Sequence, residues 1–136
     1  MGPHRRGHCP RGHGPLQAAT LLGKTVAHCQ SCKGLWLSQP VFREFLAMQA
    51  RSVLEGGEST PSKAVSLPRT SMMSARALCP ECGNVMTRRV YGSFSGILID
   101  ICERHGVWLD DNELRAIMRH IVIAGPDFAR QLLEGR

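Results

Sequence analysis

Residues 101–114 read ICERHGVWLDDNEL, and residues 28–38 read HCQSCKGLWLS. Both stretches place two potential metal ligands in the pattern C-x-x-C or C-x-x-H, ahead of a glycine and a Trp-Leu dipeptide. A residue that can cap a helix comes next, Ser38 in the first stretch and Asp110 in the second. Because the whole pattern recurs, the sequence predicts one structural unit that is present twice.

The second copy has two complete ligand pairs, Cys79-Pro-Glu-Cys82 and Cys102-Glu-Arg-His105. Between them, VMTRRVY and ILIDI flank the turn-like sequence GSFSG, which predicts a β-hairpin. A hairpin between two ligand pairs brings four side chains to one point, and Zn²⁺ accepts thiolate and imidazole in tetrahedral geometry. We therefore expect these four residues to hold a structural zinc ion.

The first copy is less regular. Cys29-Gln-Ser-Cys32 is a ligand pair, but Cys9 has no second cysteine nearby. His13 is the fourth ligand that we expect; His8 and His28 are alternatives, but each adjoins a cysteine and is expected to point elsewhere. With His13 and His105, the six cysteines make two sets of four and leave no odd thiol. The sequence thus predicts two structural zinc ions.

Helices are expected after each Trp-Leu pair. From Ser38, SQPVFREFLAMQARSVLEGG has a cap, a proline in the first turn and a Gly-Gly stop. From Asp110, DDNELRAIMRHIVIAG has Glu113 at the spacing of a capping box. It carries an apolar stripe at helical spacing, and PDFARQLLEGR restarts as a short helix. The stripe comprises Leu114, Ile117, Met118 and Ile121.

The predicted fold class is small, metal-stabilised α+β. It comprises two zinc ribbons, each a β-hairpin with two ligand pairs, and each is followed by an amphipathic helix. Neither half is expected to bury enough surface to fold without a metal. We expect a basic disordered arm over 1–8, the first ribbon and helix over 9–55, a flexible linker over 56–77, and the second ribbon with the C-terminal helices over 78–136. The linker is expected to let the two modules pivot.

The segments CPEC, from residue 79, and CERHGVWLDDNEL, from residue 102, resemble the bacterial zinc-ribbon family known as transcription-factor-IIB-type zinc fingers. The family pattern is C-P-x-C, a hairpin, C-x-x-C/H, then Gly-x-Trp-Leu-Asp and a Glu-Leu helix start. The resemblance covers 79–114 closely and 9–38 in part, since Cys9 lacks a C-x-x-C partner. It implies a link to transcription and the ligands Cys9, Cys29, Cys32, Cys79, Cys82, Cys102 and His105.

An enzyme is not expected. Catalytic zinc keeps one position open for water, whereas both sites here are expected to have four protein ligands. The hairpin tip GSFSG carries no acidic residue, and no small-molecule substrate is implied. The N-terminal sequence MGPHRRGHCPRGHG lacks the apolar core of a signal peptide, and no apolar run reaches membrane-spanning length. We expect a cytoplasmic protein, in which paired cysteines bind metal rather than form disulfides.

Two functions remain open. The formal net charge is +6, and residues 1–38 hold five basic side chains and no acidic one. Basic groups could neutralise phosphates and aromatic rings could stack on bases. The candidates for nucleic-acid binding are Arg5, Arg6, Arg11, Lys24, Arg88 and Arg89, with Tyr91 and Phe94. Trp36 and Trp108 are either core anchors, which we favour, or a further stacking platform.

The other function is that of a non-catalytic protein-interaction adaptor, which the resemblance connects with transcription. The apolar stripe from Leu114 to Ile121 is more than one ribbon is expected to cover. It would bind the other module, a second copy of the chain or a partner protein. Residues 90–136 hold seven acidic and five basic side chains, which suits a protein partner better than DNA. We rank the adaptor slightly ahead of the nucleic-acid binder.

Overall fold

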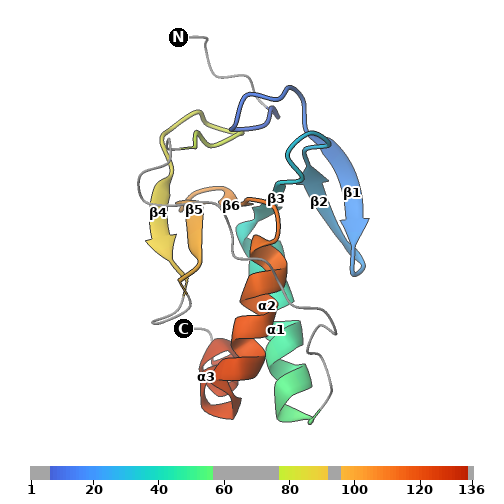
Figure 1. Ribbon diagram of the computed structural model, residues 1–136, viewed down its shortest axis with the longest axis vertical. Coiled ribbons are helices and arrows are strands. Elements are labelled where there is room, and N and C mark those ends of the chain that lie inside the picture. The colour runs from blue at the N-terminus through green and yellow to red at the C-terminus, as the bar shows by residue number, and fades with distance from the viewer. Residues whose placement is uncertain (1–6, 57–76, 92–95, 135–136) are drawn as a thin grey trace.

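The computed structural model describes residues 7–56, 77–91 and 96–134 (Figure 1). These residues form a small α+β fold with one antiparallel six-stranded sheet and three helices. Most of the predicted basic arm and linker, the tip of the second hairpin, and with them Arg5, Arg6 and Phe94, lie outside the described residues. The elements are β1 (Gln17–Leu21), β2 (Lys24–His28), β3 (Leu35–Ser38), α1 (Gln39–Leu54), β4 (Thr87–Val90), β5 (Leu98–Cys102), β6 (Gly106–Leu109), α2 (Glu113–Ala124) and α3 (Pro126–Leu133).

The two copies of the repeat join at the middle of the sheet. The strand order is β1-β2-β3-β6-β5-β4, so each copy contributes a hairpin and a third strand, and the copies meet where β3 pairs with β6. In this antiparallel pairing, which we call the central seam, Trp36 lies opposite Trp108 and Leu37 lies opposite Val107. The two Trp-Leu strands are therefore related by a local two-fold arrangement.

The central seam changes one prediction. We expected two modules that pivot on a linker, but the described parts of both copies share one sheet. A physical reason is that a lone Trp-Leu strand would leave a row of backbone N–H and C=O groups unpaired along its outer edge. The equivalent strand of the other copy supplies the missing hydrogen bonds.

Alternation of side chains gives the seam two different faces. The helix-face core lies on one side and includes Leu37, Phe45, Val107, Leu109, Ile117 and Ile121. The metal-face core lies on the other side and contains Cys9, Cys29, Trp36, Ala77, Cys79, Met86, Cys102 and Trp108. In Figure 1 the helices gather at the bottom, and the turns that precede β1 and β4 lie at the top.

The helix starts follow the sequence closely. Ser38 caps α1, and its Oγ accepts a hydrogen bond from the Val41 amide at 3.4 Å, as predicted. At α2, Glu113 Oε1 accepts a hydrogen bond from the Asp110 amide at 2.8 Å, which is half of the predicted capping box. The N-cap residue is Asn112 rather than Asp110, and the Glu113 amide donates to the Asp110 backbone carbonyl at 3.0 Å.

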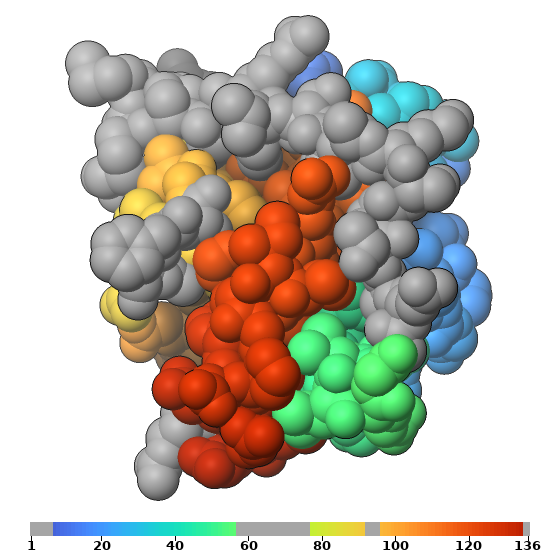
Figure 2. Space-filling model, turned by 60° about the horizontal axis from the view of Figure 1, so that its bottom comes forward, coloured from blue at the N-terminus to red at the C-terminus, as the bar shows by residue number. Residues whose placement is uncertain are grey.

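The apolar stripe of α2 is covered within the chain. Ile117 and Ile121 are fully buried, while Leu114 and Met118 are partly buried against the helix-face core. Figure 2 shows α2 (orange) lying beside α1 (green), and α3 packs against both helices. Of the three coverings that the sequence left open, the structure shows the other module, because α1 from the first copy covers the stripe together with α3. The side chains that we expected to bind a partner protein are therefore packed within the chain.

Two glycines at the central seam have no room for a side chain. A Cβ at Gly106 would overlap the carbonyl oxygen of Leu37 in the facing strand, and a Cβ at Gly34 would overlap the indole of Trp108. Both glycines belong to the repeated motif ahead of Trp-Leu. They let the facing strand and ring approach the backbone.

We expect Gly106→Ala to destabilise the metal-loaded protein by about 3 kcal/mol, because the obstructing atom belongs to the backbone and cannot rotate away. Denaturant unfolding measures the change. The exposed Thr25→Ala on β2 serves as control and should change the free energy of unfolding by less than about 0.5 kcal/mol. Equal, small effects of both substitutions would contradict the close approach of β3 and β6.

Candidate metal centres

Eight predicted ligands come together in two groups of four. In each group the ligand atoms all lie within 4.8 Å of one another. The first metal group includes His13 rather than His8 or His28, the alternatives that the sequence left open. The first metal group is Cys9, His13, Cys29 and Cys32; the second metal group is Cys79, Cys82, Cys102 and His105.

Several of the distances between ligand atoms match the edges of a zinc tetrahedron. The Sγ atoms of Cys9 and Cys32 are 3.8 Å apart, as are those of Cys82 and Cys102. The Nδ1 atom of His105 lies 3.5 Å from Cys102 Sγ and 3.6 Å from Cys79 Sγ. Tetrahedral zinc, with Zn–S near 2.3 Å and Zn–N near 2.0–2.1 Å, requires edges of about 3.8 Å and about 3.6 Å. A disulfide needs sulfurs only about 2.05 Å apart, so the pairs are not cross-linked.

Three ligand turns are built the same way. The amide of the first cysteine donates to the carbonyl five residues on, and an amide inside the turn points at that cysteine's sulfur. The closing bonds are Cys9 N to Gly14 O at 2.7 Å, Cys29 N to Gly34 O at 3.0 Å and Cys79 N to Asn84 O at 2.8 Å. The amide–sulfur contacts are Arg11 N to Cys9 at 3.3 Å, Cys32 N to Cys29 at 3.5 Å and Glu81 N to Cys79 at 3.3 Å.

This shared turn explains how His13 reaches the other ligands of the first metal group despite its irregular spacing from Cys9. His13 stands four residues after Cys9, one more than the spacing of a C-x-x-C pair, yet the closing carbonyl remains at the fifth position. Gly12 and Gly14 adopt φ values of 89° and 99°, which glycine reaches without strain. The extra residue is therefore absorbed by left-handed glycines, and the His13 Nδ1 atom lies 3.5 Å from Cys9 Sγ.

The thiols of each group have divergent acidities. Burial raises the pKa of Cys29, but the amides of Cys32 and Ser31 outweigh it and lower the pKa to about 7. The Asn84 amide lowers the pKa of Cys82 to about 7. Burial raises the pKa of both Cys32 and Cys79 to about 12. A metal that binds all four ligands must displace the remaining thiol protons, so binding releases protons.

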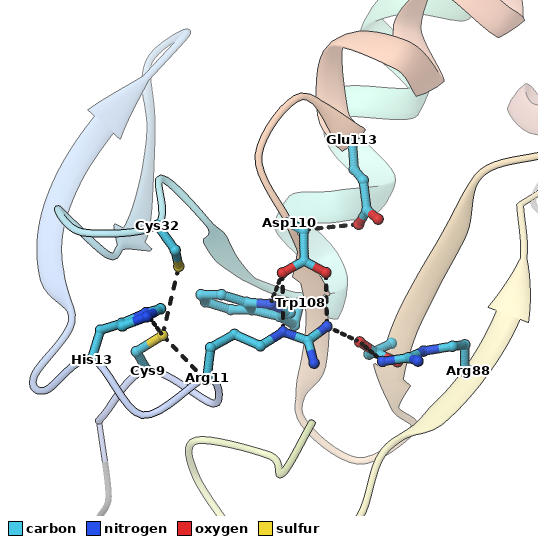
Figure 3. Close-up of polar contacts among 9 residues, drawn as sticks. Cys9, Arg11, His13, Cys32, Arg88, Trp108, Asp110 and Glu113 are labelled. Carbon is cyan, nitrogen blue, oxygen red and sulfur yellow. Dashed lines mark hydrogen bonds and ion pairs between the residues drawn. The ribbon is translucent and has the colours of Figure 1, made fainter. Parts of the chain in front are cut away.

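A network of charged groups connects the first metal group to the second copy (Figure 3). Arg11 lies between Cys9 and His13 in the sequence. Its guanidinium donates two hydrogen bonds to the Asp110 carboxylate, from Nε at 3.1 Å and from Nη2 at 2.8 Å. The same Nη2 lies 3.2 Å from Asp100 Oδ2. Asp110 also accepts a hydrogen bond from the Trp108 indole N–H at 3.0 Å. The first ligand turn is thus held by residues of the second copy.

Arg88 completes this network from β4. Its Nε and Nη2 donate to the two carboxylate oxygens of Asp100 at 2.8 and 3.2 Å, with side-chain exposures of 0% and 1% for the two residues. Asp100 therefore lies between two guanidiniums. Sequence reasoning did not single out Asp100, although a carboxylate between the isoleucines of ILIDI signals a buried charge that needs a partner.

The ligand turn that begins at Cys79 makes the reciprocal contact with the first copy. Glu81 occupies the same place after Cys79 that Arg11 occupies after Cys9, and its carboxylate accepts a hydrogen bond from the Trp36 indole N–H at 3.2 Å. Trp36 and Trp108 are both buried in the metal-face core. Both are thus core anchors, as we favoured, and the stacking-platform interpretation is wrong.

The predicted nucleic-acid residues are divided by the structure. Arg11 and Arg88 bind carboxylates inside the chain, so the prediction that they contact phosphates is wrong. Tyr91 is 9% exposed and makes edge-to-face contacts with Phe42 and Phe128, so it is not available to stack on a base. Burial raises the Tyr91 pKa. Lys24 and Arg89 remain at the surface, paired with Glu44 at 3.2 Å and Glu103 at 3.1 Å.

Comparison with known proteins identifies one family match. Residues 78–120 match the family described as transcription factor zinc-finger. The match spans β4, β5, β6, the second metal group and the start of α2, and it supports zinc binding there. The first metal group has no family match of its own, although it has the same donor set. No curated protein and no solved structure matches the chain. Within the described residues, no helix is long and apolar enough to cross a membrane.

We expect His13→Ala to abolish tight metal binding at the first metal group only, because it removes one of four ligands. Cobalt titration should then show one tightly bound tetrahedral ion per chain instead of two. The matched controls His8→Ala and His28→Ala should retain two. If His13→Ala retained two tightly bound ions and one of the other two variants bound only one, the fourth ligand would be a different histidine.

We expect Arg88→Ala to destabilise the protein by about 3–5 kcal/mol, because it leaves the buried Asp100 carboxylate short of a partner. Its neighbour Arg89→Ala is the control and should change stability by less than about 1 kcal/mol, since the Arg89–Glu103 pair is exposed. Denaturant unfolding of the metal-loaded variants measures both. Similar stabilities would contradict the buried position of Arg88.

Proposed function

We propose that the chain binds two structural zinc ions and acts as a non-catalytic protein-interaction adaptor in transcription. The observation that carries the proposal is the completeness of both metal groups. Each supplies three cysteines and one histidine whose ligand atoms all lie within 4.8 Å of one another. A catalytic zinc ion keeps one position for water or substrate, whereas four protein ligands fill the coordination shell.

The donor chemistry favours zinc. Thiolate and imidazole select zinc over Mg²⁺ and Ca²⁺, which prefer oxygen ligands. The amides that point at Cys9, Cys29 and Cys79 stabilise the thiolate form. The match of residues 78–120 to a family described as transcription factor zinc-finger supports both the metal and the setting.

A groove between α1 and α3 supports the adaptor function. It has a volume of about 500 Å³, and its walls include Leu46, Ala47, Leu132 and Leu133. Arg43, Glu44 and Arg51 also line it. Glu44 pairs with Lys24, whereas within the described part of the chain neither arginine has an ion pair. Because the α2 stripe is buried, we assign partner binding to this groove instead. An amphipathic helix with acidic and leucine-like side chains fits its charge and shape.

Affinity capture from the source cell tests this surface. We expect the zinc-loaded protein to retain a partner that Arg43→Glu/Arg51→Glu loses, because both reversals repel an acidic helix. The matched control is Arg115→Glu/Arg119→Glu, which makes the same charge change on α2, outside the groove. A protein captured by the wild type and the control, and at least tenfold less by the groove variant, supports the adaptor. Equal capture of a protein by all three forms would contradict the groove as the binding surface, and capture of no protein by the wild type would contradict the adaptor.

A nucleic-acid function is the alternative that the same preparation tests. Fluorescence anisotropy against labelled single- and double-stranded oligonucleotides should show no binding tighter than about 10 µM at physiological salt, since two of the basic candidates face inward. Tighter binding that weakens steeply with salt, and that weakens further in Lys24→Ala/Arg89→Ala, would favour nucleic acid over the adaptor.

A further inference from the structure

The ligand turns that begin at Cys9 and at Cys79 are each bonded to the other half of the molecule. Arg11, within the first metal group's turn, bonds Asp100 and Asp110 of the second copy. Glu81, within the second metal group's turn, bonds Trp36 of the first copy. The backbone adds a direct bond, since the amide of Gly7 donates to the carbonyl of Pro80 at 2.9 Å. The two turns are therefore linked to each other as well as to their own metal ligands.

We propose that the two metal groups bind zinc with positive coupling, and that Arg11 is the residue that transmits it. This inference rests on the proposed structural zinc ions and goes beyond them: an ion in either group raises the affinity of the other group. Neither group is then an independent zinc site, although each has a complete set of ligands.

The first step of the coupling is the position of Arg11. It lies two residues after Cys9 and two before His13, and its amide points at Cys9 Sγ at 3.3 Å. A metal ion that fixes Cys9 and His13 fixes the backbone on both sides of Arg11. The guanidinium is then held in the orientation in which it grips Asp110 with two hydrogen bonds. Figure 3 shows Arg11 pointing from the turn toward Asp110.

The second step is the effect of Arg11 on the second copy. Asp100 is fully buried and lies in β5, the strand that ends at Cys102. Asp110 directly follows β6, which begins one residue after His105. Withdrawing the Arg11 guanidinium would leave these two carboxylates with one cation fewer in a largely buried setting, which is unfavourable. The end of β5, which carries Cys102, and the turn between β5 and β6, which carries His105, are therefore held better when the first metal group is loaded.

The test compares overall and single-group zinc affinities, measured by competition with a chromophoric chelator. Cys32→Ala disables the first metal group, and Cys82→Ala disables the second. Without coupling, the two-ion binding constant of the wild type equals the product of the two single-group constants. We expect it to exceed that product by about 5- to 150-fold, the usual range for coupled sites.

Arg11→Gln then tests the route, because it keeps all eight ligands and removes only the charged fork. In Arg11→Gln, the ratio of the two-ion binding constant to the product of the single-group constants should fall to within about twofold of one. Arg11→Lys, which keeps the charge without the planar fork, should give a ratio between those of Arg11→Gln and the wild type. Arg130→Gln, at an exposed ion pair on α3, is the matched control and should keep the full excess. Near-ultraviolet circular dichroism of each zinc-loaded variant verifies that it is folded.

The outcomes separate this inference from the proposed function. If the wild type binds two ions and its two-ion binding constant equals the product of the two single-group constants, the coupling is overturned and the structural zinc ions remain. An excess that survives in Arg11→Gln would mean that coupling runs through the shared core, and the role of Arg11 would be wrong. Fewer than two tightly bound ions in the wild type would overturn the proposed zinc function itself.

Discussion

The pairing of β3 with β6 is the constraint on which the other features depend. It puts Trp36 opposite Trp108 on one face of the sheet, while Leu37, Val107 and Leu109 contribute to the helix core on the other. The pairing is tight enough that Gly106 has no space for a Cβ. Each of these strands is only four residues long, and α1, which begins directly after β3, contacts both of them.

The charged network has a different role from that of the core. Removing Arg88, Asp100 and Arg11 from water costs free energy, and their mutual attraction offsets that cost without necessarily exceeding it. What such a network supplies is geometry. Asp100 is reached by Arg88 from its own hairpin and by Arg11 from the first ligand turn. In this arrangement of the two copies both guanidiniums reach the same carboxylate, so the network ties the position of one copy to that of the other.

Features encoded by local spacing could be predicted from the sequence. The ligand quartets depend on two turns and a hairpin within each copy, and the start of α1 depends on Ser38, so the pattern of residues was sufficient. The central seam and the Arg11 network could not be predicted in this way. Arg11 and Asp100 are separated by 89 positions along the chain, and the residues around either one do not indicate that the other is its partner. For the same reason the sequence could not decide which of the three open coverings packs on the α2 stripe, since α1, which helps to cover it, belongs to the other copy.

The repeat therefore has a structural meaning that differs from two independent metal modules in a row. A single copy would end its sheet on a Trp-Leu strand with an unpaired edge, which is a liability in a small β-structure. It would also remove a bonding partner from the residue two places after its first cysteine. That residue is Arg11 in the first copy and Glu81 in the second, and each bonds a side chain of the other copy. The second copy supplies the paired edge and the partner together. The same motif position therefore carries arginine in one copy and glutamate in the other, and each of these side chains bonds the opposite copy.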